Sequence, residues 1–189
     1  AEGPDLVLDI PKGKVITKNY VGKNIEKYDA MLVVSHFKGH PMGGYGGALK
    51  QLSIGVASSY GKAYIHGAGD VEKIWTSDHD KFLESMADAA SSVVNYFNDN
   101  IAYINIMCNM SVDCDCCAVA EDPCMKDIGI LASLDPVALD KACVDLIYNS
   151  TDSGKDKMIK RIETRNGMLT IDYAEQLGIG SKEYELVEI

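Results

Sequence analysis

Basic residues, aromatic residues and proline are scarce in this sequence, and no uninterrupted apolar stretch is long enough to cross a membrane. A membrane-spanning helix needs roughly 18 or more consecutive apolar residues, so the sequence predicts no membrane partner. The 18 Lys and Arg residues are outnumbered by 28 Asp and Glu residues, which gives a net charge of -10 at pH 7. An acidic chain repels phosphate backbones, so the sequence also predicts no nucleic-acid partner.

Several catalytic motifs are missing as well. The sequence contains no H-E-x-x-H, no G-x-S-x-G and no set of protein-kinase motifs. The glycines near position 45 do not complete the dinucleotide fingerprint G-x-G-x-x-G, because Leu49 stands where the third glycine belongs. Catalytic residues are therefore unassigned, and the sequence does not decide whether the protein is an enzyme.

The composition that remains is that of an ordinary globular protein. Of the 189 residues, 47% are apolar and 24% are charged, and no linker divides the chain. We expect a single α/β domain over residues 1–189. No signal peptide is visible at the N-terminus, where charged residues are frequent.

The order of strands and helices predicts a three-layer α/β fold, with a largely parallel sheet and helices on both faces. Residues 29–37 form a continuous apolar run, which is typical of a strand buried on both faces. Residues 101–107 and 128–133 are expected beside it, with amphipathic helices at 78–97 and 135–149 packed on the sheet. Further strands are expected at 5–10, 14–21 and 184–189, and further helices at 48–59, 155–165 and 169–177.

Cysteine is concentrated in one short segment. Five of the six cysteines lie between Cys108 and Cys124, and two of them are adjacent. Such crowding favours a metal or redox site over a disulfide framework, and it favours a reducing cytoplasm. Cys114 and Cys116 are two residues apart, so they point to the same side of an extended segment. Cys143, in contrast, falls on the apolar face of a helix and is predicted to pack in the core.

Three histidines are candidate partners for these thiols. His36 and His40 lie at the carboxyl end of the predicted strand 29–37, the edge where open α/β sheets bind ligands. His66 is a third candidate. Thiolates and imidazoles together suit zinc or iron, so Cys114, Cys116, His36, His40 and His66 form the predicted metal site.

A glycine-rich stretch precedes the helix expected at 48–59. Glycines at a helix start let backbone N–H groups turn toward an anion, and the residues concerned here are Gly43, Gly44, Gly46, Gly47 and Lys50. Close packing of a strand against a helix explains the same glycines without a ligand. Both interpretations stay open.

Several motifs occur in an order that resembles one known family. They are Ser35-His-Phe-Lys-Gly-His40, Gly44-Tyr-Gly-Gly-Ala-Leu-Lys50, Asp113-Cys-Asp-Cys116, Asp127-Ile-Gly-Ile-Leu-Ala-Ser133 and Asp135-Pro-Val-Ala-Leu-Asp140. The sequence is similar, over nearly its whole length, to the "domain of unknown function three-sixty-two" family of uncharacterised iron–sulphur-centre proteins.

The chain departs from that family in two ways. Many members carry a two-cluster ferredoxin module after the histidine that matches His66, but this chain has no cysteine there. Iron–sulphur clusters of the two-cluster ferredoxin type are therefore not expected. Members also have a substantial N-terminal segment, so the chain resembles the C-terminal portion of a longer protein, and the missing N-terminal portion is an expected partner.

Three hypotheses for the function follow. The first is a metal-binding α/β protein, a redox or metal-dependent enzyme that uses the Cys/His site. The alternative is a module that binds a small anion or another small molecule at the glycine-rich helix start, with the cysteines incidental. The third is a structural half that works only with an N-terminal partner. The substrate, the reaction, the metal and the oligomeric state are not specified by the sequence.

Overall fold

The chain contains both strands and helices, which is consistent with the predicted α/β class. The computed structural model describes residues 4–119 and 121–189; residues 1–3 and 120, which the predicted single domain includes, lie outside the described residues. The strands are β1 (Asp5–Asp9), β2 (Lys18–Gly22), β3 (Met31–His36), β4 (Lys38–His40), β5 (Gly44–Gly46), β6 (Ile101–Met107) and β7 (Gly129–Ser133). The helices are α1 (Ala48–Lys50), α2 (Ser59–His66), α3 (His79–Phe97), α4 (Pro136–Asn149), α5 (Lys155–Thr164) and α6 (Met168–Leu177). A π-helical turn at Gln51–Gly55 and short 3-10 helices at Lys23–Lys27 and Val71–Lys73 complete the elements.

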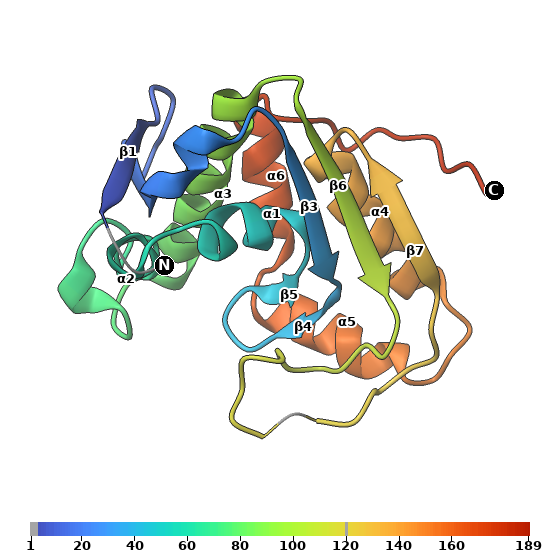
Figure 1. Cartoon of the computed structure of the whole chain (residues 1–189). Coiled ribbons are helices and arrows are strands. Elements are labelled where there is room, and N and C mark those ends of the chain that lie inside the picture. Colours follow the sequence, from blue (N-terminus) through green and yellow to red (C-terminus); the bar gives the residue numbers. More distant parts are fainter. Residues whose placement is uncertain (1–3, 120) are drawn as a thin grey trace.

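The central sheet has the strand order β3-β6-β7 and contains the three strands that the sequence predicts for it (Figure 1). β3 and β6 are parallel, with Met31 opposite Ile101. β6 and β7 are antiparallel, with Met107 opposite Gly129. Two adjacent parallel strands need a long crossover connection, usually a helix. β6 and β7 are joined by the cysteine-containing loop instead, and β7 runs back antiparallel to β6. The expected largely parallel sheet is therefore not confirmed.

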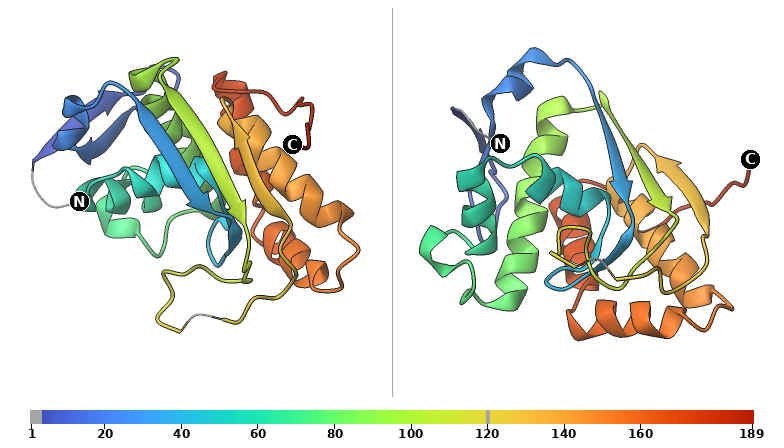
Figure 2. Two further views of the ribbon diagram at one scale, coloured as in Figure 1. Left: turned by 45° about the vertical axis from the view of Figure 1, so that its right-hand side comes forward. Right: turned by 60° about the horizontal axis from the view of Figure 1, so that its bottom comes forward.

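The helices lie on one side of this sheet, as Figures 1 and 2 show. Along β3, Val33 faces the core and is 3% exposed, whereas Leu32 and Val34 on the opposite face are 60% and 49% exposed. Ile130 of β7 is 66% exposed. The apolar run at 29–37 thus has one face uncovered by the described residues, so helices on both faces and a third layer are not confirmed.

The core lies between the inner face of the sheet and the helices α1, α4 and α6. Cys143 is fully buried there, which confirms its predicted place in the core. α4 begins as the sequence indicates, because Asp135 Oδ1 accepts hydrogen bonds from the backbone N–H groups of Val137 and Ala138, with Pro136 at the first helical position. A second, smaller cluster of apolar side chains packs between α2, α3 and the segment after β1.

Three local features differ from the prediction. The helix expected at 48–59 is split into α1, the π-helical turn and α2, whose first turn is capped by Ser58 Oγ. The glycine-rich stretch contains a short hairpin, β4–β5, instead of only a loop. Residues 184–189 form no strand. Among the helices in residues 4–119 and 121–189, none combines the length and the apolar character needed to cross a bilayer.

The two faces of β3 give a matched prediction for stability. Val33→Ala removes two buried carbons and leaves a cavity, so we expect it to lower the free energy of unfolding by about 2 kcal/mol. Val34→Ala changes an exposed neighbour and should alter that free energy by less than about 0.5 kcal/mol. Urea unfolding followed by circular dichroism measures both. Equal losses for the two variants would mean that the outer face is covered.

Candidate functional site

The hairpin β4–β5 lies against the cysteine-containing loop that follows β6. The backbone N–H of Gly39 donates a hydrogen bond of 2.9 Å to the carbonyl oxygen of Ser111. A Cβ at Gly39 would overlap the carbonyl oxygen of Val112, so only glycine allows this approach of one backbone to the other. The contact brings the end of β4, which carries His40, to the loop that carries Cys114 and Cys116.

His40, Cys114 and Cys116 form a compact group. One potential ligand atom from each residue lies within 4.8 Å of the other two. His40 and Cys114 are buried and Cys116 is exposed, so the group opens to solvent on one side. The closeness of the two cysteines agrees with the expectation from their spacing of two residues.

The His40 ring is fixed by its own hairpin. Its Nδ1 accepts hydrogen bonds from the backbone N–H groups of Gly43, at 2.9 Å, and Met42, at 3.2 Å. Burial, reinforced by the charge of Lys50, lowers the pKa of His40 to about 3. The ring is therefore neutral near pH 7, and Nε2 is the nitrogen left for a further partner.

Cations surround the two thiols. Lys50 Nζ lies 3.8 Å from Cys114 Sγ, and Lys38 Nζ lies 3.1 Å from Asp115 Oδ2. Arg161, from α5, pairs with Asp113 at 2.9 Å. The first two basic groups converge on the cysteines from separate elements, α1 and β4.

The two thiols titrate differently. Burial works to raise the pKa of Cys114, but hydrogen bonds from Cys116 and the charges of Lys50 and Lys38 outweigh it, so this pKa is lowered. Burial and the neighbouring Cys114 sulfur raise the pKa of Cys116 to about 11. The pair therefore favours a thiolate on Cys114 and a thiol on Cys116.

His36 and His66 have other partners. His36 Nδ1 lies 2.8 Å from Asp115 Oδ2, and its Nε2 lies 2.8 Å from the carbonyl oxygen of Cys108. His66 Nδ1 lies 2.7 Å from the carbonyl oxygen of Lys62, and its ring stacks on Phe82. Of the five residues in the predicted metal site, the structure brings three into one compact group.

The glycine-rich helix start already holds a carboxylate from its own chain. Backbone N–H groups of Ala48 and Leu49 donate to Asp140 at 2.8 and 3.0 Å. A Cβ at Gly47 would lie 2.5 Å from Asp140 Oδ1, which accounts for glycine there. Gly43, Gly44 and Gly46 belong to the hairpin that positions His40, where Gly44 packs against the backbone of Gly167 and Gly46 against the side chains of Lys38 and Lys50. Their expected role in anion binding stays a prediction, whereas Lys50 reaches the cysteines.

Asp140 is the residue that sequence reasoning missed. Its side chain is completely buried and also accepts hydrogen bonds from Asn105 Nδ2 at 2.7 Å and Tyr45 Oη at 3.2 Å. Burial raises the pKa of this carboxyl against the effect of its four donors. One signal was available: Asp140 shares the apolar stripe of α4 with Pro136, Cys143 and Val144.

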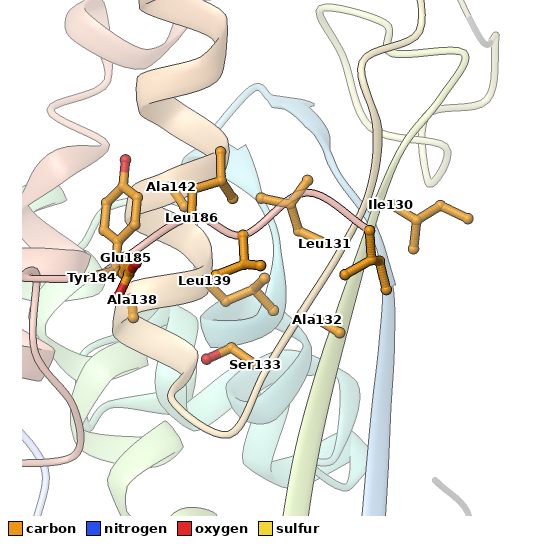
Figure 3. Close-up of a pocket in the computed structure, with 12 residues that line it drawn as sticks. Ile130, Leu131, Ala132, Ser133, Ala138, Leu139, Ala142, Tyr184, Glu185 and Leu186 are labelled. Carbon is orange, nitrogen blue, oxygen red and sulfur yellow. The ribbon is translucent and has the colours of Figure 1, made fainter.

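A separate pocket of about 380 Å³ lies between β7, α4 and the C-terminal segment (Figure 3). Its lining is mainly apolar, with Ile130, Leu139 and Leu186 as examples. The Tyr184 hydroxyl donates to Asp145 at 2.8 Å. The pocket lacks the convergence of thiol, imidazole and amine groups that the hairpin and the cysteine loop provide.

Comparison with known proteins identifies the family. A family model described as "Domain of unknown function (DUF362)" matches residues 2–145, so the chain belongs to that family. This range includes the hairpin, the cysteine loop and Asp140. No curated protein and no solved structure gives a significant match.

The role of Asp140 is testable with two substitutions in the same helix. Asp140→Ala leaves four buried donors without an acceptor, so we expect the free energy of unfolding to fall by about 3–5 kcal/mol. Asp145→Ala removes a partly exposed partner of Lys141 and should cost less than about 1 kcal/mol. Thermal and urea unfolding measure both variants. A small loss for Asp140→Ala would contradict its assigned role.

Proposed function

We propose that this member of the DUF362 family binds a divalent metal ion, zinc or iron, through His40, Cys114 and Cys116. The observation that carries the proposal is that three such donors converge within 4.8 Å of one another. Thiolates and a neutral imidazole are ligands that both ions prefer. An ion between them satisfies several buried polar atoms at once, which protein groups alone do less well.

The number of protein ligands favours a catalytic role over a structural one. Structural zinc sites are closed by four protein ligands, whereas catalytic sites have three and keep one position for water or substrate. Here the exposed Cys116 lies on the solvent side of the group. This supports a metal-dependent enzyme, and the need for reduced thiols favours the cytoplasm as its compartment.

One observation favours a second candidate, thiol redox chemistry. Because His40 Nδ1 accepts the Gly43 N–H, the ring proton resides on Nε2, where it suits a thiolate neighbour. Coordination through Nε2 would require that proton to move to Nδ1 and the Met42 and Gly43 contacts to open. In the redox alternative, the Cys114 thiolate attacks a substrate disulfide and releases one thiolate. Cys116 then loses its proton, attacks Cys114 Sγ and releases the substrate as the second thiol, which leaves a Cys114–Cys116 disulfide.

Metal analysis of anaerobically purified protein separates the candidates. We expect one zinc or iron ion per chain, and we expect Cys114→Ser and His40→Ala to weaken zinc affinity by about 100-fold or more, because removal of an outer partner of a ligand already costs about 10- to 100-fold. Cys117→Ser is the matched control, since Cys117 belongs to the same loop but not to the group, and it should retain the metal. A metal-free wild-type protein that forms a Cys114–Cys116 disulfide on oxidation would instead support redox chemistry.

The same assay tests the two remaining histidines. We expect His36→Asn and His66→Asn to keep wild-type metal content, because hydrogen-bond partners within the protein already engage both ring nitrogens of His36 and the Nδ1 of His66. Loss of the metal in either variant, with unchanged circular dichroism, would show that the substituted histidine is a metal ligand after all.

A further inference from the structure

We propose, on the basis of the metal site above, that Lys38 and Lys50 bind an oxyanion, the carboxylate or phosphate group of a small substrate, at the open position of the metal ion. This assigns a substrate class to the site. It uses the side-chain amines and not the glycine-rich helix start, whose N–H groups at Ala48 and Leu49 are bonded to Asp140.

The two lysines converge although they come from different elements. Lys38 is in β4 and Lys50 is in α1, and both side chains pass Gly46. A Cβ at Gly46 would lie 3.5 Å from Lys50 Cδ and 3.7 Å from Lys38 Cε. Lys50 Nζ then reaches Cys114 Sγ, and Lys38 Nζ reaches Asp115, the residue between the two cysteines. The aliphatic stems of both lysines therefore lie against the same backbone position.

Charge makes an anion the suitable occupant. A divalent ion with two thiolates is neutral as a unit, and around it stand three cations, Lys38, Lys50 and Arg161. Among the residues that the structure describes, two carboxylates, those of Asp113 and Asp115, pair with these cations. Within residues 4–119 and 121–189, Lys50 forms no ion pair with a carboxylate.

A bound divalent ion would take up the charge of both thiolates, so the Cys114 thiolate would no longer balance the ammonium group of Lys50. An uncompensated charge is unfavourable where water is partly excluded, and the neighbouring Lys38 is only 13% exposed. An oxyanion that coordinates the metal through one oxygen and accepts hydrogen bonds from the amines through another supplies the missing negative charge. Charge-assisted hydrogen bonds of this kind are about twice as strong as neutral ones. Anion binding thus gives the two lysines a role that coordination of the metal ion alone does not require.

Anaerobic protein loaded with cobalt(II) tests the proposal, because the visible spectrum of cobalt reports its ligands. Inorganic phosphate is titrated into one sample and acetate into another, which distinguishes the two sources of the oxyanion. We expect a saturable change in the cobalt bands with at least one of them. We expect Lys50→Met and Lys38→Met to bind one cobalt ion with unchanged thiolate charge-transfer absorbance. Their affinity for the anion that changes the cobalt bands of the wild type should fall by about tenfold or more.

Two controls complete the design. Lys50→Arg keeps the charge and should keep anion binding, and Lys81→Met, an exposed lysine of α3, should behave like the wild type. Unchanged anion affinity in Lys50→Met, or no anion response in the cobalt-loaded wild type, would overturn the substrate class and leave the metal site intact. Failure of the wild type to bind cobalt would overturn the metal site itself, and the oxyanion proposal with it. Loss of cobalt only in Lys50→Met would show that this lysine holds the thiolate and not an anion.

Discussion

A single buried carboxylate, that of Asp140, joins the segments on which the candidate site depends. It accepts hydrogen bonds from the start of α1, from Tyr45 in β5 and from Asn105 in β6. These elements lead respectively to Lys50, to the hairpin that carries His40, and to the loop that carries the cysteines. A buried carboxylate without donors would cost several kcal/mol, so the fold must bring these segments together in one arrangement. A second buried carboxylate, that of Asp88 in α3, accepts hydrogen bonds from the backbone N–H groups of Val15 and Ile16 in the same manner.

The parts of the fold that the sequence predicts well are those specified by neighbouring residues. α3 begins after Asp78 and α4 after Asp135, because a capping carboxylate and, in α4, a following proline act within one helical turn. Three of the five predicted ligands meet for a comparable reason. The spacing of Cys114 and Cys116 is local, and His40 follows a strand that ends at the same edge of the sheet as β6.

The parts that the sequence could not predict depend on contacts between distant residues. Apolar periodicity is the same for parallel and antiparallel strands, so it could not show that β7 runs against β6. Periodicity also could not show that the apolar run of β3 has one uncovered face. The partners of Asp140 lie more than 30 residues away, and a carboxylate in a helix resembles any surface acid until its surroundings are known. His36 lies outside the compact group of predicted ligands because its ring is paired with Asp115 and with the carbonyl oxygen of Cys108.

The uncovered face of the sheet and the candidate site are continuous along one strand. Side chains alternate along β3, so His36 extends the row that begins with Leu32 and Val34. The ring of His36 contacts Asp115, which lies between the two cysteines of the site. Any molecule or segment that covered the apolar row would therefore also lie beside His36 and Asp115. The exposed apolar row and the group of thiols thus share one border, at His36 and Asp115.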